Sequence, residues 1–265
     1  MRSILSIVSA AALVVTAGTA LAGAPTGQLY AVDSNRSLYK IDMATGAKTL
    51  VTSVSSNVGT PGGLAYRSDT NTVYLSSTSL DSLFTLDLNT GAATIVGAYG
   101  TDVVMHGLEW DSSTGTMYGA SSTPSSAYTI NTATGAASVL GPTGVSSFTN
   151  LGYNSTTNVM YATNSGADSF YELNRATGAL TLIGSLAGPT NPNGMAYNPS
   201  NGKLYMIDNN TDNLYTIDME SGIASVVGST GSGNLLGLVY IPVPAPSSAA
   251  ALGLAGIASL RRRRA

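Results

Sequence analysis

One block of sequence recurs five times at a spacing of about 44 residues, and this periodicity restricts the chain to a repeat architecture. The block starts with a small or polar residue, then an apolar residue, a variable residue and an aromatic one. The aromatic positions step by 44, 43, 44 and 43 residues and are Tyr66, Trp110, Tyr153, Tyr197 and Tyr240. An apolar residue followed by tyrosine recurs at nearly the same spacing, ending at Tyr30, Tyr74, Tyr118, Tyr161 and Tyr205. The period predicts copies of one supersecondary unit that pack against one another.

Each repeat carries the pattern of four short β-strands. After the two pieces above comes an alternating segment such as residues 37–41, a turn such as Thr45-Gly46, and a short apolar run such as residues 93–97. Period-two alternation rich in Tyr, Val, Ile and Thr and bounded by Asn, Asp and Gly is typical of strands. No stretch between residues 24 and 243 has the pattern of a long amphipathic helix. Four strands in about 44 residues predict the blade of a β-propeller, so we expect an all-β, five-bladed propeller over residues 23–242.

The two ends of the repeat region predict how the ring closes. The chain enters at the second strand of a blade, residues 28–33, and leaves after an isolated first strand, residues 236–241. We therefore expect the last strand to complete the first blade and to pair edges that would otherwise stay open. The predicted blades are residues 27–58 with 236–242, then 62–100, 106–144, 150–188 and 193–232.

The repeats resemble the YVTN- and NHL-type extracellular propellers over about 215 of the 265 residues. The resemblance implies the fold but little about function, because propellers include lectins, hydrolases, dehydrogenases and scaffolds. An Asp or Asn precedes each Thr-Gly or Ser-Gly turn and is predicted to form the turn rather than to bind a ligand. These five residues are Asp42, Asp87, Asn131, Asn174 and Asp218.

The N-terminus has the pattern of a secretory signal peptide over residues 1–22. Arg2 provides the basic start, residues 4–15 are apolar, and Ala20-Leu21-Ala22 is a small-residue cleavage site. The pattern predicts cleavage before Gly23 by a signal peptidase, and therefore an exported protein.

The C-terminus, residues 243–265, resembles the PEP-CTERM sorting signal of Gram-negative bacteria. It has a Pro hinge, an apolar segment over residues 249–260 and an Arg cluster, with Ala245 where that family usually has Glu. The motif residues are Val243, Pro244, Pro246, Arg261, Arg262, Arg263 and Arg264. The resemblance implies an exosortase-type processing enzyme as partner, transient inner-membrane anchoring and delivery to the cell surface or the extracellular matrix. The alternative is a retained anchor whose Arg cluster stays in the cytoplasm.

Charge and composition exclude several functions. Between the two ends lie six basic and fourteen acidic residues, a net charge of −8, which repels phosphate backbones and argues against nucleic-acid binding. The chain has no cysteine and therefore no disulfide or thiolate nucleophile. Neither a phosphate-binding glycine loop nor a calcium-loop motif is present.

Two polar residues stand out near the predicted channel. His106 is the single histidine, and Glu109 is the one carboxylate expected to face inward from a first strand. Ideal alternation puts these two side chains on opposite faces of the strand, which argues against a His-Glu dyad.

The loops between the second and third strands, and between blades, share one face and are rich in Asn and Asp. Such oxygen ligands hydrogen-bond sugar hydroxyls or bind calcium, and they are equally typical of solvated turns. The full predicted ligand-binding set is His106, Glu109, Asn150, Asn193, Asp208, Asn210 and Asp212. We expect no required cofactor, with calcium as the ion that these loops would suit.

Export, the sorting tail and the scarcity of catalytic groups favour a non-enzymatic surface or matrix protein. Its propeller would bind a glycan or a protein, such as an extracellular polysaccharide or a surface protein. One alternative is a propeller hydrolase or lactonase that uses His106, Glu109 or loop carboxylates. The other is a purely structural matrix component.

Overall fold

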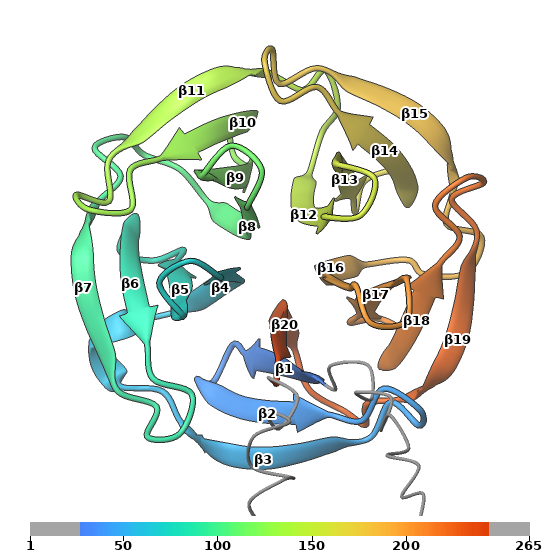
Figure 1. The fold of residues 1–265 in the computed structure, drawn as a ribbon, viewed down its shortest axis with the longest axis horizontal. Coiled ribbons are helices and arrows are strands. Elements are labelled where there is room, and N and C mark those ends of the chain that lie inside the picture. The colour runs from blue at the N-terminus through green and yellow to red at the C-terminus, as the bar shows by residue number, and fades with distance from the viewer. Residues whose placement is uncertain (1–26, 244–265) are drawn as a thin grey trace, which may run out of the picture. The chain divides into compact units, whose positions relative to one another are not determined.

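Each repeat forms one four-stranded antiparallel sheet, and five such sheets surround a central axis as the blades of a β-propeller (Figure 1). The computed structural model describes residues 27–243. The predicted signal peptide and the sorting tail beyond Val243 lie outside the described residues. The fold, the number of blades and their order agree with the sequence prediction.

In each blade, the first strand of the sequence repeat lies at the axis and the fourth strand lies at the periphery. From the axis outward, blade 1 contains β20 (Leu235–Pro242), β1 (Gly27–Asp33), β2 (Ser37–Ile41) and β3 (Lys48–Ser53). Blade 2 contains β4 (Pro61–Arg67), β5 (Thr72–Ser77), β6 (Ser82–Leu86) and β7 (Ala93–Ala98). Blade 3 contains β8 (Met105–Asp111), β9 (Thr116–Ser122), β10 (Ser125–Ile130) and β11 (Ala137–Pro142). Blade 4 contains β12 (Phe148–Asn154), β13 (Val159–Asn164), β14 (Ser169–Leu173) and β15 (Leu180–Ser185). Blade 5 contains β16 (Pro192–Asn198), β17 (Lys203–Asp208), β18 (Asn213–Ile217) and β19 (Ala224–Ser229).

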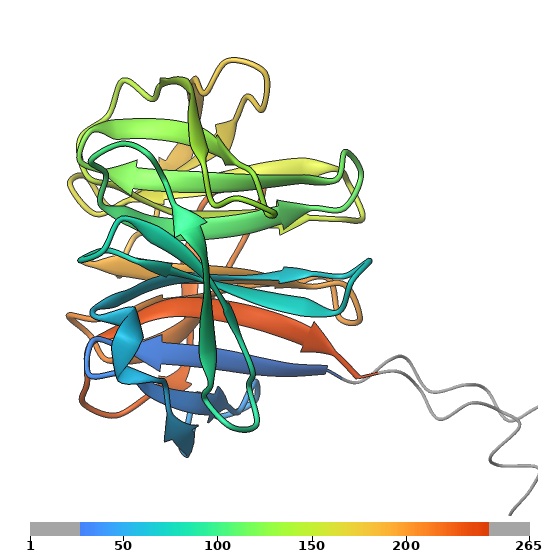
Figure 2. The ribbon, with the colours of Figure 1, turned by 90° about the vertical axis from the view of Figure 1, so that its left-hand side faces the viewer.

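The first blade is assembled from both ends of the described chain. Strand β20 pairs antiparallel with β1 from the Gly27–Pro242 pair to the Asp33–Leu235 pair. Figure 2 shows β1 in blue beside β20 in orange-red. The predicted ring closure is therefore confirmed.

The core consists of five apolar layers, each between two neighbouring blades. The layer between blades 1 and 2 joins Val32 to Leu64 and Leu75, and the layer between blades 5 and 1 joins Leu29 to Tyr205. The same alternation along each strand supplies side chains to the layers on both of its faces. Every blade therefore depends on two neighbours for the burial of its apolar residues.

The predicted turn residues also link the blades at the periphery. The Asn174 side chain accepts hydrogen bonds from the backbone N–H groups of Ala176 and Thr177, at 2.9 and 3.2 Å, as predicted for a turn former. Gly178 in the same turn has φ of 76°, and a Cβ there would lie 2.8 Å from the carbonyl oxygen of Gly141 in the preceding blade. The turn therefore needs glycine both for its conformation and for close contact with its neighbour.

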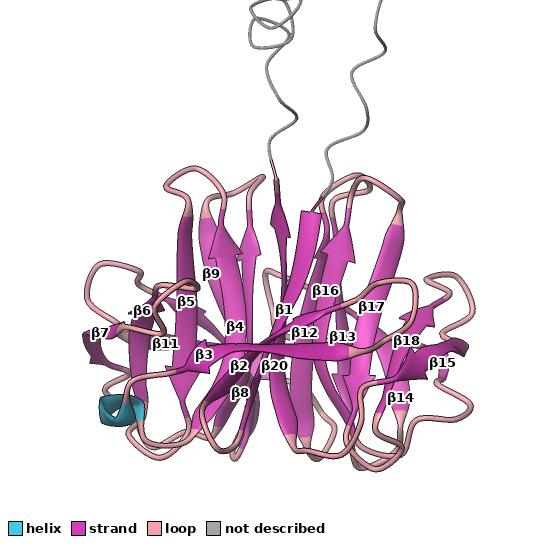
Figure 3. Cartoon of the chain, turned by 90° about the horizontal axis from the view of Figure 1, so that it is seen from below, coloured by secondary structure: helices cyan, strands magenta, loops and turns pink. Residues whose placement is uncertain are grey.

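Helical structure between residues 27 and 243 is limited to one 3₁₀ turn, η1 (Ser56–Val58), drawn in cyan in Figure 3. No helix within this range is long and apolar enough to cross a membrane.

Closure by β20 gives the first prediction. A chain that ends at residue 234 loses the innermost strand of blade 1 and with it Leu238 and Tyr240, each worth about 1.5–3 kcal/mol of burial. We expect aggregation or a broad, non-cooperative melting curve by circular dichroism and light scattering. The matched control ends at Val243 and keeps β20. Equal melting curves for the two truncated chains would show that the ring does not depend on this strand.

Candidate functional site

The innermost strands β4, β8, β12, β16 and β20 surround the axis, and each contains a register shift in its first half. In β8 the ladder passes from Met105 directly to Gly107, so His106 is a bulged residue. The bulge interrupts the ideal alternation, and both His106 and Glu109 line the channel. Alternation alone therefore does not decide whether the two side chains meet. They nevertheless line different pockets, so they form no dyad.

A narrow apolar waist separates the two pockets. It is formed by one equivalent residue from each innermost strand: Leu64, Leu108, Leu151, Met195 and Leu238. The preceding position is glycine in four of the five blades. A Cβ at Gly63 would lie 2.5 Å from the backbone nitrogen of Leu108, so glycine permits the close approach of neighbouring strands at this level. The fifth blade has Asn150 instead.

His106 and Asn150 lie on one side of this waist, in a cavity of only about 10 Å³. Nδ1 of His106 and Oδ1 of Asn150 are buried without a hydrogen-bond partner. Burial lowers the pKa of His106, which keeps the imidazole neutral at pH 7. A cavity of this size holds a single water rather than an organic ligand.

The polar loop residues on this face do not converge on a ligand site. Asp208 is buried, and its carboxylate accepts bonds from the backbone N–H groups of Thr190, Asn191, Asn210 and Thr211. Its acceptor capacity is therefore used to hold two loops together. No cluster of three or more His, Asp or Glu suited to a metal ion occurs between residues 27 and 243.

The remaining loop candidates have similar structural roles. The side-chain amide of Asn193 donates to the backbone oxygen of Asn191, and that of Asn210 donates to Thr190. Asp212 has φ of 50° and is the last residue of the turn between β17 and β18. These three residues thus shape the loops, and the structure does not bring them together with Glu109.

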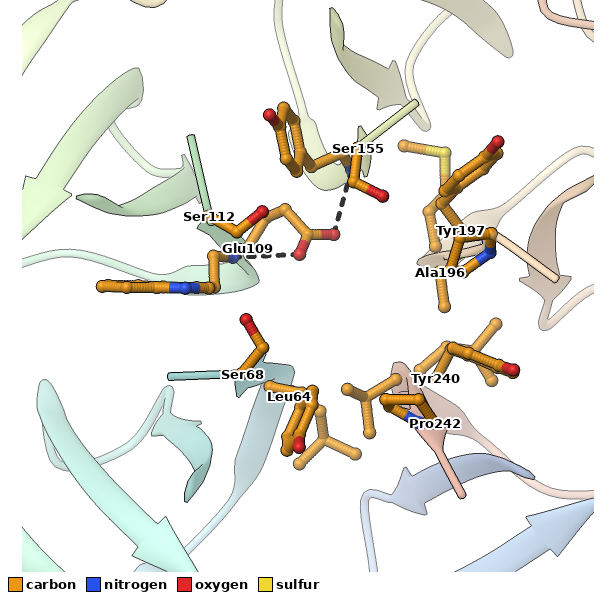
Figure 4. A pocket seen from close by; sticks show the side chains of 16 residues that line it. Leu64, Ser68, Glu109, Ser112, Ser155, Ala196, Tyr197, Tyr240 and Pro242 are labelled. Carbon is orange, nitrogen blue, oxygen red and sulfur yellow. Dashed lines mark hydrogen bonds between the residues drawn. The ribbon is translucent and has the colours of Figure 1, made fainter. Parts of the chain in front are cut away.

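On the other side of the waist lies a larger pocket of about 140 Å³, which we call the funnel (Figure 4). It opens at the ends of the innermost strands, where the described chain begins and ends, because its lining includes Pro242, the partner of Gly27. The five aromatic residues of the repeat form its wall. The residues two positions further on form its rim and are Ser68, Ser112, Ser155, Pro199 and Pro242.

Glu109 is the one carboxylic acid among the described residues that line the funnel. Its Oε1 accepts the backbone N–H of Trp110 at 2.9 Å, and its Oε2 accepts that of Tyr153, in the next blade, at 3.1 Å. Figure 4 shows the carboxyl group held between these two bonds below Ser155. Burial raises the pKa of Glu109 to about 8, the two N–H donors oppose that shift, and the charge of Asp111 adds to it.

Two arginines stabilise the wall behind the funnel. Arg175 reaches from blade 4 to the carboxylate of Asp111 in blade 3 and stacks over Tyr153, 5.6 Å from its ring centre. Burial acts to raise the pKa of Asp111, but hydrogen bonds from Ser113, Thr114 and Arg175 outweigh it and hold the pKa at about 2.

On the other side of blade 3, Arg67 from blade 2 stacks over Trp110 at 4.7 Å and forms an ion pair with Asp69. Both arginines are thus engaged, and neither is among the residues that line the funnel.

The sequence prediction chose the other face of the propeller and so missed the funnel. It identified Glu109 but grouped it with polar residues that do not line the funnel. A signal was present in the repeat itself, because Ser68, Ser112 and Ser155 recur two residues after the aromatic position. Their recurrence marks the end of the innermost strands as a small-residue rim.

Comparisons with known proteins identify the fold. A family model described as a repeat of unknown function, DUF6923, matches residues 113–234, which is less than half of the chain. No curated protein matches the sequence significantly.

Three solved structures are similar to this chain. A chain of a nidogen/laminin complex has a TM-score of 0.58 and 16% identity, with 82% of this chain and 85% of that chain covered. A symmetrical protein described as an example of de novo evolutionary emergence has a TM-score of 0.56 and 17% identity, with 83% and 100% covered. A streptogramin B lyase has a TM-score of 0.50 and 13% identity, with 77% and 66% covered. At these identities the likeness concerns the propeller fold alone.

The raised pKa of Glu109 gives a prediction for stability. Because the folded chain holds this proton more tightly than the unfolded chain, protonated Glu109 favours the fold fully below pH 4.5, and this contribution is lost as the pH rises to about 8. Glu109→Gln removes the effect, so Tm of the wild type should fall relative to the variant between pH 5 and pH 8. The control, Glu172→Gln, replaces an exposed carboxylate and should follow the wild type. Parallel curves of Tm against pH for the wild type and Glu109→Gln would refute a raised pKa for Glu109.

Proposed function

We propose that this chain is an exported, non-enzymatic surface or matrix protein whose propeller binds a glycan or a protein segment in the funnel. The observation that carries the proposal is a preformed pocket at the channel mouth, with apolar and aromatic walls around one fixed carboxyl group. Ligand sites in proteins are typically concave and mostly apolar, with few placed polar groups.

The chemistry of the funnel supports binding over catalysis. Hydrolysis by general acid–base or nucleophilic chemistry needs a second group beside the first. The other polar side-chain groups that line the funnel are hydroxyls of serine and tyrosine and the indole N–H of Trp110, and His106 lies beyond the waist. Glu109 alone would be a proton donor without a partner to activate water. A propeller hydrolase at this site would therefore need the ligand itself to supply the second catalytic group.

The proposed location rests on the two ends of the sequence. The signal pattern of residues 1–22 and the sorting pattern of residues 243–265 together favour export, transient membrane anchoring and release to the surface or matrix. Charged residues make up 9% of the whole chain, and the net charge of −8 between its two ends argues against nucleic-acid binding.

Blocking the funnel tests the binding proposal. Ser155 is exposed on the rim, so Ser155→Trp should fill the mouth without disturbing the core, and binding of the full chain to glycan and peptide arrays should fall by tenfold or more. The control is Thr101→Trp, an exposed position in the loop between β7 and β8 on the opposite face, which should bind as the wild type does.

Three outcomes would contradict this proposal. Binding that survives Ser155→Trp but is lost in Thr101→Trp would place the site on the face of the Asn- and Asp-rich loops. Hydrolysis of an arrayed glycan that disappears in Glu109→Gln would make the protein an enzyme. The absence of binding on both the glycan and the peptide array would favour the purely structural alternative.

Mass spectrometry of protein purified from the cell surface tests the export proposal. We expect a chain that starts near Gly23 and ends near Pro244, because signal peptidase and an exosortase-type enzyme would remove the two ends. Surface protein that still carries Arg261 to Arg264 would refute processing of the tail and favour a retained anchor.

A further inference from the structure

We propose that the funnel is a site for a primary ammonium group on a short apolar stem, such as the amine of a lysine side chain in a bound protein segment. This inference rests on the proposed function and names the chemical class of its ligand. It is carried by the fixed orientation of the Glu109 carboxyl group, by the absence of a basic residue among the described residues around it, and by the size and apolar character of the pocket.

The first observation is the position of the carboxyl group. Each of its oxygens accepts one backbone N–H, from Trp110 in blade 3 and Tyr153 in blade 4. Two donors, one for each oxygen, are the arrangement that suits an ionised carboxylate, because each N–H stabilises negative charge. Both donors are backbone atoms, one from each of two blades, so the position of the carboxyl group does not depend on a second flexible side chain.

The second observation is that this carboxyl group has no cationic partner within the described part of the protein. No Lys, Arg or His is among the described residues that line the funnel. The two nearby arginines are engaged elsewhere, Arg67 with Asp69 and Arg175 with Asp111. A cation from outside can therefore supply the partner that the fold leaves out, and the net charge of −8 between the two ends of the chain favours its approach.

The third observation is the space beside Glu109. The floor of the funnel is apolar and includes Leu64, Met195 and Leu238. Its volume of about 140 Å³ is close to that of a cavity that holds benzene, about 150 Å³. This is room for an ammonium group with a stem of several carbons.

Titration distinguishes an ammonium ligand from a neutral one. Without a ligand, burial and Asp111 keep the pKa of Glu109 at about 8, so the carboxyl group is mostly protonated at pH 7. The other ionisable side chains that line the funnel are Tyr66 on β4, Tyr153 on β12, Tyr197 on β16 and Tyr240 on β20. An ammonium ion favours the ionised carboxylate and must displace its proton on binding, whereas a neutral alcohol does not.

The experiment follows the carboxyl carbon of Glu109 by ¹³C NMR in the full chain, with n-butylammonium chloride as the probe and n-butanol as its neutral counterpart. We expect the pKa of Glu109 to start near 8 and to fall by at least one unit in saturating n-butylammonium. The apparent affinity should rise about tenfold between pH 7 and pH 9, because the fraction of ionised Glu109 rises by that factor while the amine stays protonated.

Variants locate the effect. Glu109→Gln should abolish n-butylammonium binding, and Glu172→Gln, at an exposed carboxylate of β14, should retain it. Should Glu109→Gln fail to fold, the pH dependence and the pKa shift of the wild type decide the question without it.

The inference is overturned if n-butanol binds as tightly as n-butylammonium, or if the pKa of Glu109 does not move. It also falls if the affinity is independent of pH. Array binding that is lost in Ser155→Trp but unaffected in Glu109→Gln would keep the funnel as a binding site while removing the ammonium group as its ligand. Failure of the inference and failure of the proposed function are therefore separable.

Discussion

The core of this structure depends on the antiparallel pairing of β20 with β1, because each apolar layer lies between two blades and the pairing completes blade 1. Without that pairing, Leu29 and Tyr205 have no complete layer between them, and blades 1 and 5 present open faces. A ring of five blades has no terminal repeat that could carry a polar cap, so the two ends of the repeat region must meet. The outer turns, where Gly178 contacts Gly141, reinforce the same ring at its periphery.

Closure also creates the candidate site. Five innermost strands drawn toward one axis approach so closely that Gly63 and Gly194 have no room for a Cβ, and the apolar waist divides the channel in two. The funnel therefore has a closed floor. A carboxyl group such as Glu109 that projects into it loses much of its hydration, which explains the raised pKa.

The site depends on one departure from the repeat. The residues equivalent to Glu109 are Ala65, Gly152, Ala196 and Val239, which are small or apolar and leave the funnel open. Glu109 therefore places a carboxyl group on one side of a pocket whose other equivalent positions carry none. The backbone N–H groups that hold this carboxyl group belong to blades 3 and 4, so the ionisable side of the pocket lies at these two blades.

The number of blades, the closing strand and the turns could be predicted from the sequence, because the 44-residue period and residues such as Asn174 and Gly178 report local conformation and burial. The sequence also identified Glu109 as the inward carboxylate. Which residues share a pocket, in contrast, follows from the packing of different blades around the axis. The bulge at His106 interrupts the β8 ladder, the waist separates His106 from Glu109, and the carboxylate of Asp208 accepts hydrogen bonds from the backbone of two loops. These outcomes depend on how closely strands from different blades approach, a distance that no pattern within one strand contains.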